Sequence, residues 1–530
     1  MKTGMKKLLF FLVLYILSVV VRIYPIFVTP IPYNVDALLD LRASQFIADH
    51  GNLNFPSNAS YNNHHTPVTI LFNALCGAIS QMTGIPVMSF IPYIFPFITS
   101  LSVLGWYLAI KKFTGKEEIG IFASLFFALG GTYVLQSSLV WKEAIGLTIM
   151  PFAIYTYKRR NALSLFLFFL LPLTHHYVCL ITYLFLSYSV FFDYYRRYKE
   201  HRILERREYL WIFATPLLWG YMAVYYFLTL FDRLKELSPS GDLWLFISLF
   251  VLLSILGIKT LNTIYKGTKI WHYLIIILPI LIFYGTYFIN PIFPDTMKFN
   301  ATTLLFTLGF LPLLPPVIQG TYLLLTSEYK ERHSYLSILF APLQMVLFFF
   351  LRGLDLISYV SLSRTFDFLD PAVSTALGTS VVGRKRKVAF AIFVFLLVAT
   401  TTPLAYHTTE AFGVTYFIYP EEKHAAQWIR NNFPNSTVYT DDKLGLVARN
   451  GFDLNVSRGL PLLLKDGKKR GNIWLLGNYW EKGAQMSPMA PVKVDVDEVL
   501  ENNSVVFSSG TTYVVLNGSV DSVSWRLQDI

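Results

Sequence analysis

Apolar runs of about twenty residues recur along most of the chain and predict a bundle of membrane-spanning helices. An α-helix rises about 1.5 Å per residue, so about twenty apolar residues cross the hydrocarbon core of a bilayer. The pattern predicts spans at about 6–27, 88–110, 118–136, 143–157, 161–178, 179–193, 209–230, 242–258, 271–289, 301–325, 334–351, 365–382 and 388–405. The expected fold class is therefore mainly α, a polytopic transmembrane helix bundle of about thirteen spans.

Basic residues gather in alternate loops and predict how the bundle is oriented. With the N-terminus placed in the cytoplasm, 24 lysine and arginine residues fall in inner loops and 8 in outer loops. Cytoplasmic loops of membrane proteins carry such an excess. The same count predicts that 67–83 lies along the membrane surface, because one more crossing would invert every later loop.

Composition agrees with a membrane protein. Charged residues make up 15% of the chain, hydrophobic residues 54%, and the mean hydropathy is +0.48. Soluble domains carry about 25% charged residues. The net charge of +11 is accounted for by the inner loops, so no nucleic-acid partner is expected. Cys76 and Cys179 lie in apolar surroundings and suggest no disulfide framework.

The composition changes after residue 405, which predicts two domains: a transmembrane domain over 1–405 and an extracytoplasmic α/β domain over 406–530. Helical spacing runs through Glu421–Phe433. Strand-like segments follow at Ser436–Thr440, Ile473–Leu476 and Thr512–Leu516.

The first external loop, 28–87, holds an acidic pair, Asp36 and Asp40, and two adjacent histidines, His64 and His65. Asp36 and Asp40 lie four residues apart on a helix predicted up to His50, so they share a face. A carboxylate buried without a partner near lipid costs several kcal/mol. The two carboxylates are therefore either exposed to water or part of a functional site. The alternative is that Asp36 caps the helix that follows it.

Three further polar sites fall near the outer ends of predicted spans. Lys142 and Glu143 lie in a loop, and they either take part in a functional site or form an ion pair exposed to water. His175 and His176 end the fifth span; ionisable groups at that depth usually face a cavity, and the alternative is a structural pair. Arg364 precedes the twelfth span. Its planar fork suits phosphate, while the alternative is an ion pair within its own helix.

Together these features resemble the GT-C class of membrane glycosyltransferases. The likeness rests on one span before an acidic first external loop, an amphipathic helix ending near Gly51, and His65-Thr66-Pro67 leading into an interfacial helix. The number of spans, the charge bias and the external C-terminal domain are similar too. The layout looks most like the archaeal relatives of the Stt3 oligosaccharyltransferase subunit and the dolichyl-phosphate-sugar-dependent enzymes.

The resemblance implies roles for the candidate residues. Asp36 matches the catalytic first-loop aspartate, which acts as a base or a metal ligand. A divalent metal, Mg²⁺ or Mn²⁺, would be held by Asp36, Glu143 and His175. Arg364 matches an arginine that holds the lipid's phosphate. The remaining substrate-binding candidates are Lys142, His64, His65, His176 and Asp40.

Two departures from the family pattern limit these expectations. Trp141-Lys142-Glu143 replaces a fuller Asp-Asn-Glu pattern, and because Lys142 can itself contact phosphate, metal dependence stays open. The Trp-Trp-Asp-Tyr-Gly signature of oligosaccharyltransferases is absent from the sequence, so recognition of an Asn-x-Ser/Thr acceptor is unsupported.

The expected function is transfer of a sugar, with inversion, from a polyprenyl (dolichyl) phosphate or pyrophosphate donor to an extracytoplasmic glycan, lipid or protein. The enzyme would be a multi-pass protein of the plasma membrane, with its C-terminal domain outside the cell. The alternatives are a transporter or flippase of lipid-linked glycans, and an oligosaccharyltransferase or polysaccharide polymerase.

Overall fold

The fold is known from a computed structural model. It describes residues 2–29, 31, 37–56, 59, 69–159, 163–234, 239–262, 311–326, 332–352, 364–406, 417–468, 470–486 and 490–517. Helices dominate the part before residue 407. They are α1 (Lys2–Val28), α2 (Ala37–His50), α3 (Leu71–Thr83), α4 (Val87–Thr114), α5 (Glu117–Leu129), α6 (Gly131–Ser138), α7 (Lys142–Lys158), α8 (Leu163–Leu170), η1 (Leu171–Leu173), α9 (His176–Lys199), α10 (Arg206–Leu234), α11 (Pro239–Asn262), η2 (Leu311–Leu313), α14 (Leu314–Thr326), α15 (Arg332–Arg352), η3 (Phe366–Phe368), α17 (Asp370–Val382) and α18 (Lys387–Tyr406).

Several of these helices match the predicted spans closely in position. By length and composition, four described helices can cross a membrane: Lys7–Val28, Val87–Thr114, His176–Lys199 and Gly241–Asn262. Shorter apolar helices occur at Leu163–Leu173 and Lys387–Pro403. The predicted span 271–289 lies outside the described residues, and 301–325 does so in part. The count of thirteen therefore stays a prediction.

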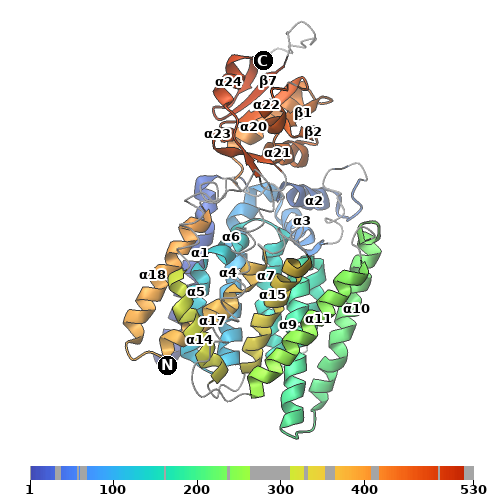
Figure 1. Cartoon of the computed structure of the whole chain (residues 1–530). Coiled ribbons are helices and arrows are strands. Elements are labelled where there is room, and N and C mark those ends of the chain that lie inside the picture. The colour runs from blue at the N-terminus through green and yellow to red at the C-terminus, as the bar shows by residue number, and fades with distance from the viewer. Residues whose placement is uncertain are drawn as a thin grey trace.

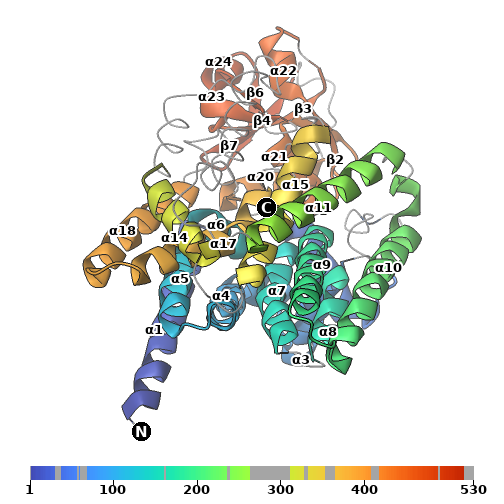
Figure 2. The same ribbon diagram turned by 60° about the horizontal axis from the view of Figure 1, so that its bottom comes forward.

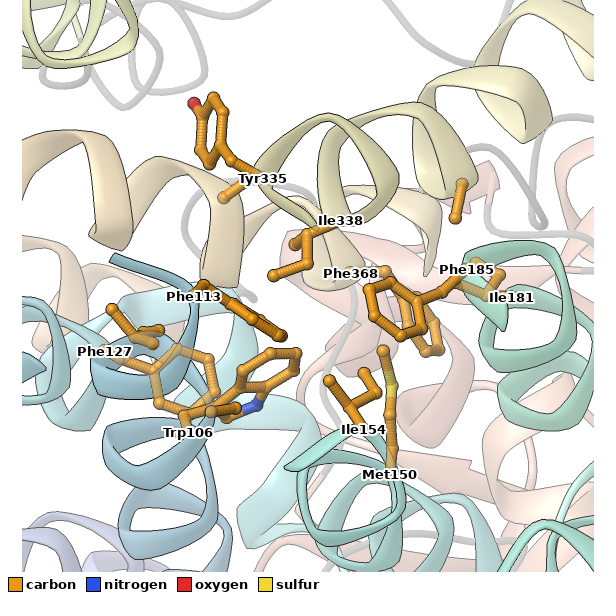
Figure 3. Packing of buried hydrophobic residues seen from close by; sticks show 14 of the residues in the cluster. Trp106, Phe113, Phe127, Met150, Ile154, Ile181, Phe185, Tyr335, Ile338 and Phe368 are labelled. Carbon is orange, nitrogen blue, oxygen red and sulfur yellow. The ribbon is translucent and has the colours of Figure 1, made fainter. Parts of the chain in front are cut away.

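The interior of the bundle is a continuous layer of apolar side chains. Trp106 of α4, Met150 of α7, Phe185 of α9 and Ile338 of α15 are buried and point toward one another (Figure 3). Close approach of backbones also contributes, as is common among helices in lipid. A Cβ added to Gly320 would lie 1.7 Å from a backbone oxygen of α17, so α14 and α17 pack this tightly only with glycine there.

The predicted span 118–136 is wrong in one respect, because it is two helices. The chain breaks at Gly130, between α5 and α6, with φ −59° and ψ 113°. A break leaves backbone groups without intrahelical partners. Hydroxyls of α18 satisfy two of them: Thr402 Oγ1 donates to Leu129 O at 2.7 Å, and Gly131 N donates to Thr401 Oγ1 at 3.0 Å. Hydropathy alone carries no signal for such a break.

Arg22 is one of the eight cations assigned to outer loops although it falls inside the predicted span 6–27, and it is a fully buried residue of α1. Its guanidinium donates to Ser18 Oγ at 2.7 Å and to Ser137 Oγ of α6 at 2.8 Å. It also donates to the carbonyl oxygen of Ala128, at the end of α5, at 3.4 Å. Arg22 therefore joins α1 to both sides of the interruption, which explains how its charge is tolerated inside the bundle.

The boundary predicted between 161–178 and 179–193 also moves. The first segment ends with η1 at Leu173, and α9 begins at His176. Pro172 lacks a backbone N–H, which favours the end of a helix. His175 is extended, with φ −159° and ψ 129°, so a new helix starts after it.

The C-terminal region forms a small α/β unit. Its elements are α20 (Pro420–Asn432), β1 (Thr437–Thr440), α21 (Asp442–Phe452), β2 (Asn455–Arg458), α22 (Leu460–Lys465), β3 (Ile473–Gly477), α23 (Trp480–Gly483), β4 (Ala484–Met486), β5 (Ala490–Val492), α24 (Val496–Glu501), β6 (Ser504–Ser508) and β7 (Thr512–Leu516). The main sheet has the order β2-β1-β3-β7-β6. Strand β1 is parallel to β2 and β3, and β7 is antiparallel to β3 and β6. The helix and three strands predicted for this region are confirmed, while its division from the bundle at residue 405 stays a prediction.

This unit sits on one end of the helical bundle, hereafter the domain end, while the N-terminus lies at the opposite end (Figure 1). Helix α2 connects the two parts. Arg42 donates to Asn450 O at 2.8 Å and pairs with Asp453, and Leu38 joins the apolar core of the α/β unit. Turning the molecule shows α14, α17 and α18 together at one side of the bundle and α9, α10 and α11 at the other (Figure 2).

Candidate functional site

Three ionisable side chains from separate elements meet at the domain end of the bundle. Glu143 is the second residue of α7, His175 precedes α9, and Arg364 precedes η3. Glu143 Oε2 lies 3.8 Å from His175 Nε2 and 3.9 Å from Arg364 Nη1. The structure thus brings together residues that are far apart in sequence and that were each predicted to take part in the site.

The carboxylate of Glu143 is the most unusual group in this cluster. Its side chain is 1% exposed, and neither oxygen accepts a hydrogen bond from the described residues. Buried polar atoms nearly always have a hydrogen-bond partner, and a buried charge without one is costly. The two nearest ionisable neighbours, His175 and Arg364, lie beyond hydrogen-bond distance. The alternative of a solvated Lys142–Glu143 pair is therefore wrong, and the carboxylate has the capacity to bind a further group.

Arg364 is held in place although its guanidinium donates no hydrogen bond to any of the described residues. Its guanidinium carbon lies 5.3 Å from the ring centre of Trp141, a cation–π contact, and the side chain is 31% exposed. The next residue, Thr365, shares a hydrogen bond with the hydroxyl of Tyr177 on α9. A fixed guanidinium fork with open donors suits bidentate recognition of a phosphate.

The two histidines differ in their surroundings. His175 is buried and faces Glu143, whereas His176 is exposed. Their ring centres lie 4.5 Å apart, and that of His176 lies 6.4 Å from the ring of Tyr226 on α10. Only His175 is therefore placed to act on the Glu143 carboxylate, while His176 borders the cluster on the α10 side.

Lys142 extends the cluster toward α2. Its Nζ lies 3.3 Å from Asp40 Oδ1, with side-chain exposures of 17% for Lys142 and 4% for Asp40. Because Lys142 and Glu143 are consecutive, this ion pair adjoins the first group of residues. The other predicted site residues, Asp36, His64 and His65, lie outside the described residues.

Sequence reasoning missed Trp141, Tyr177 and Thr365 as parts of the site. Trp141 and Tyr177 are neighbours of Glu143 and His175 in sequence, which is the one signal that would have suggested them. The pairing of Tyr177 with Thr365 depends on how α9 packs against the segment before α17, and no local pattern encodes it.

The fit to a divalent metal is partial within the described part of the chain. No group of three or more histidine, cysteine, aspartate or glutamate side chains occurs there. Glu143 and His175 offer two donor groups, and the Glu143 oxygens lack hydrogen bonds. Mg²⁺ keeps several water ligands and is commonly held by one or two carboxylates together with substrate phosphates. The residues are thus compatible with such an ion.

Comparisons with known proteins bear on the fold. No family model matches the chain, and no curated protein matches its sequence. Among solved structures, the apo form of the oligosaccharyltransferase from Archaeoglobus fulgidus is similar at a TM-score of 0.53 and 11% identity, covering 89% of this chain and 70% of that one. At this identity the likeness concerns the fold alone, and it confirms the predicted Stt3-like layout of the GT-C class. ArnT from Cupriavidus metallidurans bound to undecaprenyl phosphate is similar at 12% identity over 99% of this chain and 100% of that one, but its TM-score of 0.41 is too low to establish a shared fold.

Proposed function

We propose that the chain is a membrane glycosyltransferase that moves a sugar from a polyprenyl phosphate or pyrophosphate donor to an acceptor outside the cytoplasm. The observation that carries this proposal is the meeting of Glu143, His175 and Arg364 at the domain end. Charged groups inside a membrane bundle are costly and commonly mark a substrate path. The oligosaccharyltransferase fold shared with the archaeal structure supports the same reading.

The donor's phosphate would bind at Arg364 and Lys142. The guanidinium donates no hydrogen bond to the described residues, so its donors remain available for phosphate oxygens. Lys142 is held by Asp40 beside the same cluster. As the bond between the sugar and the phosphate oxygen breaks, its electron pair stays on that oxygen, and these two cations stabilise the added charge.

Asp36 would act as the general base. It accepts the proton of the acceptor hydroxyl while the hydroxyl oxygen forms a bond to the anomeric carbon, and the phosphate leaves from the opposite face. This in-line displacement inverts the anomeric centre. Asp36 directly precedes α2, which carries Asp40 and contacts the α/β unit.

A divalent metal, Mg²⁺ or Mn²⁺, would be held by Glu143 and His175 together with Asp36, and when bound it would neutralise negative charge on the leaving phosphate. The acceptor is a glycan, a lipid or a protein. The protein would be located in the plasma membrane, with the domain end outside and the lipid tail of the donor among the helices.

A matched pair of variants tests the phosphate role of Arg364. Arg352 lies at the same end of the bundle and pairs with Asp242 at 3.1 Å, so Arg352→Ala removes an arginine of similar setting. Arg364→Ala should lower kcat/KM for a lipid-linked sugar donor by about 10–100-fold, because hydrogen bonds to charged groups are worth about 1.5–3 kcal/mol. Arg352→Ala should change it by less than about threefold. Equal losses of kcat/KM in the two variants would show that Arg364 does not bind the donor's phosphate specifically.

A transporter of lipid-linked glycans is the second candidate, and the break between α5 and α6 is the observation that favours it. Interrupted helices line the substrate sites of many transporters. Here, however, the backbone groups at the break are bonded to Thr401, Thr402 and Arg22. Release of free sugar or of polyprenyl phosphate by purified protein separates the two functions, since a transporter returns the lipid-linked sugar unchanged.

A further inference from the structure

The opposite end of the bundle carries a cluster of cations that the proposed reaction does not use. Four consecutive basic residues, Arg384, Lys385, Arg386 and Lys387, join α17 to α18. The ion pairs of Lys387 with Glu118 at 2.8 Å and of Lys7 with Glu117 at 3.0 Å place this turn beside the starts of α5 and α1.

Part of this charge is unfavourable as it stands. Arg384 and Lys385 follow the C-terminus of α17, where partial negative charge favours cations. Arg386 and Lys387, however, lie at the N-terminus of α18, where cations are destabilising. Lys387 has an acidic partner in Glu118, and Arg384 donates to the neutral amide oxygen of Gln319. Lys385 and Arg386 are exposed and have no acidic partner among the described residues. An anion bound at this turn would relieve the repulsion among the four cations and the unfavourable dipole at the start of α18.

The cations border a groove rather than standing on a convex surface. The groove lies between α14 and the start of α18 and has a volume of about 750 Å³. Its lining combines Gln319, Arg384, Lys385 and Arg386 with the rings of Phe390 and Phe393. Arg384 is positioned on two sides, by Gln319 and by the ring of Phe390, whose centre lies 5.0 Å from the guanidinium carbon.

The apolar side of the groove is continuous with an exposed apolar face of α18. Along α18, Val388, Ile392, Phe393 and Leu396 are between 50% and 72% exposed. In both views α18 lies at the edge of the bundle beside α14 and α17 (Figures 1 and 2). A ligand that fits must therefore present a negative headgroup at the turn and an apolar chain along the helix.

We propose that this groove is a binding site for an anionic phospholipid of the leaflet opposite the α/β domain, with the phosphate at Arg384, Lys385 and Arg386 and an acyl chain along Phe390 and Phe393. Basic clusters next to a membrane helix attract anionic lipid. A bound acyl chain distinguishes such a site from a general excess of positive charge in the loops of that side. The proposal does not depend on the transferase activity.

Native mass spectrometry of the full chain, titrated with phosphatidylglycerol or phosphatidylcholine, tests the site. The wild type should retain phosphatidylglycerol in preference to phosphatidylcholine. The triple variant Arg384→Gln/Lys385→Gln/Arg386→Gln should weaken phosphatidylglycerol binding at least about tenfold, given roughly 1 kcal/mol per basic residue near a charged membrane surface. The matched control, Lys111→Gln/Lys112→Gln/Lys116→Gln, removes as much charge from the last turn of α4 and the loop that follows it, beside Glu117 of α5. It should bind the lipid as the wild type does.

A second variant tests the apolar half of the groove. Phe393→Gln leaves every cation in place and should also weaken phosphatidylglycerol binding, by about threefold or more, since it removes an apolar wall of the groove. Equal loss in the two triple variants, or binding of glycerophosphoglycerol as tight as that of the whole lipid, would overturn the proposal. The first result would mean that the basic residues only contribute to the charge bias that orients the helices in the membrane. The second would mean that the groove binds soluble phosphates and does not recognise an acyl chain.

Discussion

Nζ of Lys142 lies 3.3 Å from Oδ1 of Asp40, which ties the first turn of α7 to helix α2. Since α2 also contacts the α/β unit through Arg42, this pair links the bundle, the segment between α1 and α3, and the C-terminal region. Lys142 precedes Glu143 in the chain, and its ammonium group pairs with the Asp40 carboxylate. In the proposed mechanism Asp40 therefore positions Lys142.

Kinetic parameters of single and double variants test that assignment. Lys142→Met should lower kcat/KM about 10–100-fold, since a hydrogen bond to a charged group is worth about 1.5–3 kcal/mol. Asp40→Asn should lower it by less than about tenfold, mainly through KM. If Asp40 acts through Lys142, the double variant is no worse than Lys142→Met alone. Fully additive losses would give Asp40 a separate role.

The contact between Glu143 and Arg364 predicts a particular pattern of stability. Arg364→Ala leaves a buried carboxylate with one fewer cation nearby, so it should reduce the free energy of unfolding by about 2 kcal/mol. Adding Glu143→Gln removes that charge and should restore most of the loss in thermal unfolding, while transfer activity stays low. A double variant less stable than either single variant would mean that the two side chains do not interact as an ion pair.

Metal binding at Glu143 can be measured apart from catalysis. Electron paramagnetic resonance titration of the full chain with Mn²⁺ should show one bound ion per chain, and Glu143→Gln should weaken its binding at least about tenfold, the usual loss for removing a metal-orienting group. Asp40→Asn is the matched control, because Asp40 is a second nearly buried carboxylate at the same end. Unchanged Mn²⁺ binding in Glu143→Gln would remove this residue from the ligand set.

The α/β unit should lose stability as pH rises through about 6. Burial raises the pKa of Asp441 to about 6, although Tyr479 and the backbone N–H groups of Leu444 and Gln485 donate to its carboxylate. Because the folded pKa exceeds the unfolded value of about 3.9, the stabilising contribution is complete below pH 4 and is lost by about pH 6, a difference of about 3 kcal/mol. Burial also raises the pKa of Glu422, so a second group acts in the same direction.

Hydrogen exchange of peptides from β1, β3 and β7 in the full chain, corrected for intrinsic rates, measures this dependence. Protection should be higher at pH 5 than at pH 7. Asp441→Asn should make the dependence weaker without abolishing it, since Glu422 still titrates. The same pH dependence in the variant and the wild type would show that Asp441 does not titrate in this range.

Much of the fold was predictable because a helix needs an apolar segment of a certain length to cross a bilayer and because basic residues gather in the loops on one side. Apolar run lengths and loop charges indicated the helices, and strand patterns indicated β1, β3 and β7. Two of the departures in the bundle involve polar groups whose hydrogen-bond partners come from distant segments. The break at Gly130 depends on hydroxyls of α18, and the burial of Arg22 depends on Ser137. Partners so far apart in sequence leave no periodic signal.

The candidate site, too, was predictable from the sequence only in part. His175 was suspected because ionisable groups are rare at membrane depth, and Glu143 and Arg364 because they match positions of the GT-C pattern. Their mutual placement was not predictable from spacing, since it follows from the packing of α7, α9 and the segment before α17. The expectation that they act together came from the GT-C resemblance. The structure places Glu143 beside His175 and Arg364, while the roles of the three residues stay predictions.

The most direct test uses purified protein in lipid nanodiscs with a radiolabelled sugar on polyprenyl phosphate, an acceptor mixture, and separation of the sugar from its lipid. The wild type should transfer the label and release polyprenyl phosphate, and Asp36→Asn should lower that rate by about 100–10,000-fold, the range for general-base catalysis. Full activity of Asp36→Asn, or translocation of the labelled lipid with its sugar bond intact, would contradict the account.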